Sequence, residues 1–187
     1  MTKVFYPALL CIIFSISVQA QREINNPLVN SKDVIAKGVA LHDEGKYKEA
    51  IIEYLKVPAS DTGYSDVLHE MILSYYNDSN YSAAEKYVRV AQTMFPERNP
   101  DWYGFLADIY DDTKRTEQAL PLYDSILTQN PYSYLSYFNK GITLMRLSRM
   151  EEAEANFQRC IVLNPYYSSA HHFLGRLSLI KGNLTQA

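Results

Sequence analysis

The sequence predicts an all-α fold, a solenoid of helix-turn-helix hairpins, on three observations. Apolar residues between positions 134 and 165 recur every three or four residues, which is the spacing of amphipathic helices. A break at residues 147–149 divides this stretch into two helices, and Pro165 should end the second. The same arrangement returns along the chain. Because one hairpin cannot bury its apolar faces alone, neighbouring hairpins must stack against it.

The repeat is visible as ladders of residues that share one register. An alanine returns every 34 or 35 residues, at Ala50, Ala84, Ala119, Ala153 and Ala187. A small or apolar residue stands twelve positions before each alanine, at Gly38, Ile72, Ala107, Gly141 and Gly175. Aromatic or apolar residues stand four positions after the first four alanines, at Tyr54, Val88, Tyr123 and Phe157. Prolines keep the same period at Pro96, Pro131 and Pro165. We therefore expect small inward-facing residues where two helices approach closely.

This pattern resembles the tetratricopeptide repeat family, whose repeats carry a small residue, an alanine, an aromatic residue and a proline in this order. The turn strings GKYKEA at 45–50 and GNLTQA at 182–187 are close to the family pattern. The resemblance implies a right-handed superhelical solenoid over residues 31–187. Its repeats would span residues 31–64, 65–98, 100–133 and 134–167, with an incomplete fifth at 168–187.

Two prolines mark departures from the repeat pattern. Pro58 comes early in the first repeat, so its second helix should be short. Pro121 should fall near the start of a second helix, where the loss of its N–H costs little because the first N–H groups of a helix lack partners.

The last repeat should be unfinished and frayed. Ala187 would fall inside a second helix that has only begun, which leaves Phe173, Leu174 and Leu177 partly uncovered. A solenoid normally ends in a polar capping helix, so we expect the sequence to be the front part of a longer protein.

The first 20 residues are predicted to be a signal peptide, and residues 21–30 a polar lead-in. Lys3 precedes a mostly apolar stretch, and residues 18–20 (VQA) form a small-residue cleavage pattern. A transmembrane anchor is the alternative, but the apolar stretch of about 15 residues is short against the ~20 of a spanning helix. A lipoprotein signal at Cys11 is disfavoured by the bulky Leu10 before it. We expect a bacterial-type exported protein of the periplasm or cell envelope, or a secreted one, without stable membrane insertion after cleavage.

Composition argues against several functional classes. The net charge of −3 gives no basic stripe for nucleic acid. The four histidines do not converge as metal ligands would, and no nucleophile motif or glycine-rich phosphate loop is present. We therefore expect no enzyme activity, no cofactor and no metal. Cleavage of the signal peptide would leave Cys160 alone, which rules out a disulfide within the mature chain and favours a small buried residue.

A groove formed by the first helices is the remaining candidate site. The resemblance implies a concave face that binds a protein or peptide segment, through His69, Leu73, Tyr76, Asp108, Asp112, Phe138, Ile142, Arg146 and Arg176. Apolar members would anchor the segment, and the two aspartates would select a basic residue. The alternatives are purely structural roles. Phe138 would pack against a neighbouring repeat. A solvated face would be formed by Asp101, Asp108, Asp111 and Asp112, with Asp112 paired to Arg146.

The sequence thus predicts a non-catalytic protein-interaction scaffold. Family members that hold a C-terminal carboxylate use a Lys and Asn clamp, and Ile35, Val39, Leu73 and Asp108 stand at those places here. Chaperone docking of that kind is therefore not expected. The alternative function is an accessory region of a longer enzyme or sensor whose active domain lies beyond Ala187.

If residues 1–20 are a signal peptide, the chain should be cleaved after Ala20 during export. Intact-mass measurement on protein from the envelope fraction should give a chain beginning at Gln21. A chain that retains Met1, or that stays in the cytoplasm, would contradict both the signal peptide and the location.

Overall fold

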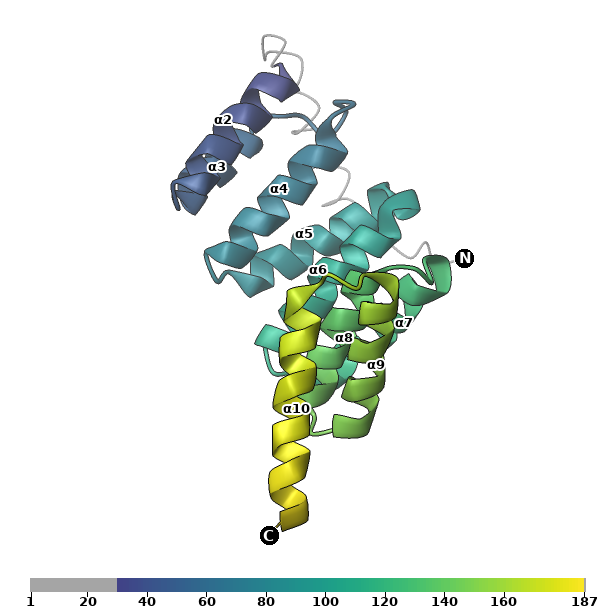
Figure 1. The fold of residues 1–187 in the computed structure, drawn as a ribbon. Coiled ribbons are helices and arrows are strands. Elements are labelled where there is room, and N and C mark those ends of the chain that lie inside the picture. Colours follow the sequence, from purple (N-terminus) through teal and green to yellow (C-terminus); the bar gives the residue numbers. More distant parts are fainter. Residues whose placement is uncertain (1–29, 187) are drawn as a thin grey trace, which may run out of the picture. The chain divides into compact units, whose positions relative to one another are not determined.

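The computed structural model describes the backbone of residues 30–186. It describes the surroundings of side chains for residues 30–182. These residues form helices joined by short turns and contain no β-strand, which confirms the all-α prediction (Figure 1). The helices are α2 (Ser31–Asp43), α3 (Tyr47–Tyr54), α4 (Tyr64–Asn77), α5 (Tyr81–Met94), η1 (Pro96–Arg98, a 3-10 helix), α6 (Asn99–Asp112), α7 (Thr116–Gln129), α8 (Tyr134–Arg146), α9 (Met150–Leu163) and α10 (Ser168–Gln186). The predicted signal peptide at 1–20 and all but the last residue of the lead-in lie outside the described residues. Among residues 30–186, none of the helices has both the length and the apolar character of a membrane span.

The structure divides into two compact units, and the division falls inside α4 between Glu70 and Met71. In the first unit, α2 and α3 form a hairpin in which α3 has only eight residues, as Pro58 led us to expect. A Cβ atom at Gly38 would lie 2.2 Å from Cε1 of Tyr54, and Tyr54 is fully buried. Glycine is therefore required where the tyrosine ring packs against the α2 backbone.

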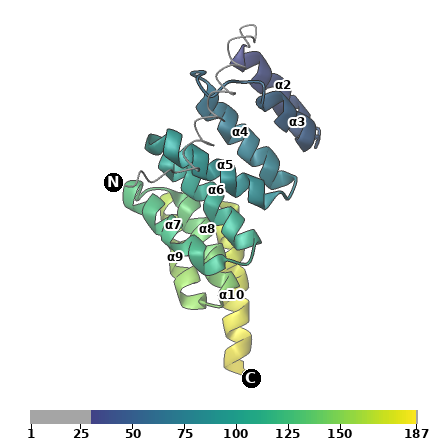
Figure 2. The same ribbon diagram turned by 180° about the vertical axis from the view of Figure 1, so that it is seen from behind.

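The second unit contains consecutive helix hairpins. Helices α6 and α7 form one hairpin, α8 and α9 form the next, and α10 packs against α9. Both views show α10 lying along the α8–α9 hairpin and extending beyond it (Figures 1 and 2). The core of this last part consists of Leu120, Leu144, Ala153, Phe157 and Leu177. Cys160 is fully buried, in agreement with its interpretation as a small core residue, and burial raises the pKa of its thiol.

The first helix of each hairpin (α2, α4, α6 and α8) ends in the same way. One residue takes a positive φ, and these residues are Gly45 (75°), Ser79 (58°), Lys114 (62°) and Ser148 (60°). The next N–H then donates to a carbonyl five residues earlier, as Arg149 N does to Leu144 O at 2.9 Å. These bonds satisfy carbonyls that the helix end leaves free. Because the helices end alike, residues in their last turns occupy equivalent places in successive hairpins.

The prediction of a second turn near the C-terminus is wrong. Helix α10 is continuous from Ser168 to Gln186, so the helix does not break at Gly182. Leu177, expected to be partly uncovered, is 1% exposed, whereas Phe173 and Leu174 are partly buried as expected. A turn would forfeit several intrahelical hydrogen bonds, and only a second helix packed against the first can compensate for that loss.

The expected position of Pro121 also needs correction. Helix α7 begins at Thr116, so Pro121 lies in the second turn, beyond the N–H groups that lack partners at a helix start. The carbonyl of Glu117 therefore has no helical donor at that place. The helix nevertheless continues to Gln129.

Two glycines at the same repeat position provide a matched test of the close helix approach. A Cβ atom at Gly141 would lie 2.6 Å from Cε1 of Phe157, whereas one at Gly175 would meet nothing within 4 Å. Gly141→Ala should lower the free energy of unfolding by about 1–3 kcal/mol through overpacking. Gly175→Ala should raise it by roughly 0.5–1 kcal/mol through helix propensity. Urea unfolding measures both, and equal effects of the two substitutions would contradict the packing described.

Candidate binding pocket on the first helices

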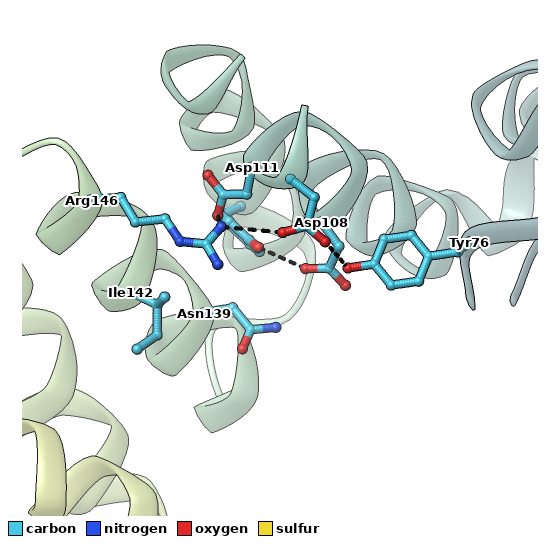
Figure 3. A pocket seen from close by; sticks show the side chains of 8 residues that line it. Tyr76, Asp108, Asp111, Asn139, Ile142 and Arg146 are labelled. Carbon is cyan, nitrogen blue, oxygen red and sulfur yellow. Dashed lines mark hydrogen bonds and ion pairs between the residues drawn. The ribbon is translucent and has the colours of Figure 1, made fainter. Parts of the chain in front are cut away.

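One pocket lies in the second unit, where the last turns of α4, α6 and α8 meet. Its volume is about 150 Å³. It is lined by Tyr76, Asp108, Asp111, Asp112, Tyr123, Asn139, Ile142 and Arg146, and we call it the acidic pocket. In Figure 3, Tyr76 and Arg146 reach it from opposite sides, with Asp108 and Asp111 between them. The shared register of the helix ends brings these side chains together.

Side chains from three other helices hold the aspartates of α6. The hydroxyl of Tyr76 donates a hydrogen bond to Oδ2 of Asp112. From α7, the hydroxyl of Tyr123 donates to Oδ1 of Asp108 at 3.2 Å. From α8, Oγ1 of Thr143 donates to Oδ2 of Asp111 at 2.6 Å. Each carboxylate is therefore positioned by a different neighbouring helix.

Arg146 supplies the positive charge of the acidic pocket. Its Nη1 atom lies 3.4 Å from Oδ2 of Asp111 and 3.7 Å from Oδ1 of Asp112. Its side chain is 46% exposed, while that of Asp111 is 6% exposed. Three carboxylates face one guanidinium, so the pocket carries two excess negative charges when every carboxyl is ionised.

Burial sets the protonation of these groups. It raises the pKa of Asp108 to about 6, helped by the negative charges of Asp111 and Asp112 and opposed by the Tyr123 hydrogen bond and Arg146. Burial also raises the pKa of Asp111, against the Thr143 hydrogen bond and Arg146. The pKa of Tyr76 is raised by burial first and then by its bond to Asp112, so its hydroxyl remains a donor.

The pocket brings together five of the nine residues predicted for the groove: Tyr76, Asp108, Asp112, Ile142 and Arg146. Leu73 lies one turn before Tyr76 on α4 and is partly buried, but it does not line the pocket. His69 belongs to the first unit. Arg176 is an exposed residue of α10, and its guanidinium lies 5.4 Å from the ring centre of Phe173.

Phe138, predicted as a groove anchor, lies instead in an aromatic cluster. Its ring centre is 5.7 Å from that of Phe157, 5.0 Å from that of Tyr167 and 5.7 Å from that of Phe173. These rings belong to α9, to the turn that follows it and to α10. Phe138 therefore contributes to packing between neighbouring helices, which is the structural alternative to a binding role.

The alternative of a solvated face formed by the four aspartates is also wrong in part. Asp101 is exposed and pairs with Arg98 at 3.1 Å, away from the pocket. Asp108 and Asp111 are partly or largely buried, because side chains from α7 and α8 cover them. The expected pairing of Asp112 with Arg146 is present, although Arg146 lies closer to Asp111.

Sequence reasoning missed Tyr123 and Asn139 as pocket residues. Tyr123 stands on the aromatic ladder, a position that indicates core packing, and the residue is 2% exposed. Its hydroxyl nevertheless reaches Asp108. Asn139 precedes Ile142 by three positions on α8, so helical spacing alone places both on one face.

Comparison with known proteins identifies the family. Models described as tetratricopeptide repeat match residues 69–134 and residues 134–167. Together they span more than half of the 187 residues. The chain belongs to the tetratricopeptide repeat family.

One curated relative is the tetratricopeptide repeat and J domain-containing co-chaperone DNJ1 of Fusarium oxysporum f. sp. lycopersici, 32% identical over 68 residues. That match spans 36% of this chain but only 13% of the relative's length.

Solved structures resemble most of the chain. MamA from Desulfovibrio magneticus RS-1 superposes with a TM-score of 0.69 at 16% identity, covering 86% of this chain and 90% of that chain. A tetratricopeptide repeat protein from Parabacteroides merdae gives 0.67 at 20% identity, covering 82% of this chain and 60% of that one. At these identities the likeness establishes the fold alone.

Proposed function

We propose that this tetratricopeptide repeat protein is a non-catalytic interaction scaffold that binds a segment of a partner protein across the last turns of α4, α6 and α8. The observation that carries the proposal is the acidic pocket, to which α4, α6 and α8 of successive hairpins all contribute. Stacked repeats present extended surfaces of this kind to their partners. A segment that lies across several hairpins can contact each first helix in turn.

The dimensions of the pocket favour a partner side chain over a small substrate. Its volume is about 150 Å³, whereas sites for small ligands commonly occupy roughly 300–1,000 Å³. Ile142 offers an apolar wall inside the pocket, and Leu73 lies one turn from Tyr76 on α4. These residues would anchor the segment, while the aspartates would orient it.

Location in the cell envelope is part of the same proposal. It is supported by the apolar stretch and the small-residue pattern before Gln21. The intact mass of the mature chain tests it independently of binding.

Site-directed photo-crosslinking tests the binding face. A photoreactive amino acid at position 142 should crosslink in cells to a segment of a discrete partner protein, identified by sequencing the crosslinked peptide. Position 162 on α9 is the control, because Val162 is 68% exposed and does not line the pocket. Crosslinks that form equally at both positions, or only at 162, would contradict the proposed face.

A further inference from the structure

The acidic pocket already holds one cation, the guanidinium of Arg146. It lies 3.4 Å and 3.7 Å from the nearest oxygens of Asp111 and Asp112, distances longer than those of charge-assisted hydrogen bonds. Nearly half of the Arg146 side chain remains exposed. The pocket therefore accommodates a guanidinium, but it holds this one loosely and from the solvent side.

Asp108 forms no ion pair with that cation. Its bonded neighbour is the Tyr123 hydroxyl, and none of the ion pairs within the described residues includes Asp108. A largely buried carboxylate without a cation is costly at neutral pH, where most of this group is ionised. A second cation placed beside Asp108 would remove that cost.

We infer that the acidic pocket receives the cationic end of a lysine or arginine side chain from the bound segment, and that Arg146 competes for the same carboxylates in the free protein. This inference rests on the proposed function and names the chemistry of the partner segment. The two excess negative charges leave room for one more cation even while Arg146 stays in place. Ile142 supplies an apolar wall for the methylene groups of the entering side chain.

The binding should depend on pH through Asp108. The groups that face it are Tyr76 from α4, Tyr123 from α7, Arg146 from α8, and Asp111 and Asp112 on its own helix. An entering cation favours the ionised carboxylate, so the pKa of Asp108 is lower in the complex than in the free protein. Affinity should therefore fall as pH drops through about 6, where Asp108 of the free protein takes up a proton.

The test compares two peptide probes that differ only in the ammonium group of the lysine side chain, which norleucine lacks. Acetyl-Leu-Lys-Leu-amide and its norleucine analogue are titrated into the isotope-labelled full chain at pH 7.5 and pH 5, with amide NMR shifts on α6 and α8 as the readout. The lysine peptide should bind roughly ten-fold tighter at pH 7.5. Most of that advantage should disappear at pH 5.

Matched variants assign the effect to individual residues. Asp108→Asn keeps the shape and an acceptor for Tyr123, and it should abolish the preference for lysine. Asp101→Asn makes the same change on the same helix away from the pocket and should leave the preference intact. Arg146→Met removes the competing charge and should strengthen binding of the lysine peptide. Thermal melts verify that each variant is folded.

Several outcomes would overturn the inference. They are equal binding of the two peptides, a lysine preference that survives Asp108→Asn, weaker lysine binding by Arg146→Met, or shifts caused by calcium chloride but not by the lysine peptide. If position 142 still crosslinks to a partner in any of these cases, the proposed function stands and only the chemistry assigned to the pocket fails.

Discussion

The close approach of two helix backbones within a hairpin is the constraint on which the second unit depends. Phe157 can lie against α8 only because residue 141 has no side chain. The same ring stacks on Phe173 of α10 and contacts Phe138 of α8. One glycine therefore allows a single aromatic ring to join three helices, which couples each hairpin to its neighbour as expected for a repeat protein.

The acidic pocket is a consequence of this regular packing. The helix ends are fixed by the positive-φ residues of the turns, so Asp112 and Arg146 occupy equivalent places as the last residues of α6 and α8, and Tyr76 lies next to the last residue of α4. The hairpin partner α7 contributes Tyr123, whose hydroxyl bonds to Asp108. Packing thus creates the pocket, and the charges placed there decide what it can bind.

Much of this arrangement could be predicted from spacing alone. The ladders indicated the helix pairs, the close approach at Gly141 and the pairing of Asp112 with Arg146, because each depends only on position within a repeat. Burial was harder to predict. Phe138 shares the groove-facing spacing with Ile142, and only the contacts with Tyr167 and Phe173 show that it packs in the aromatic cluster. The depth of Asp108 likewise depends on a side chain from another helix.

The continuous helix α10 shows a further limit of sequence patterns. Residues 182–187 resemble the turn string at 45–50, yet the helix continues past Gly182. At residues 45–50, α3 packs back against α2, whereas α10 continues as one helix that packs against the preceding hairpin. A turn motif thus predicts a turn only where a partner helix stabilises it.

Among the described residues, Asp108 is a largely buried carboxylate that belongs to no ion pair, and the proposed partner segment would supply its cation. Carbon-13 NMR can measure the pKa of its carboxyl group in the full chain, with and without acetyl-Leu-Lys-Leu-amide. The structure predicts a pKa of about 6 in the free protein and a lower value when the peptide is bound. A pKa near the ordinary 3.8, unchanged by the peptide, would show that Asp108 neither lies buried without a cation nor receives one from the peptide.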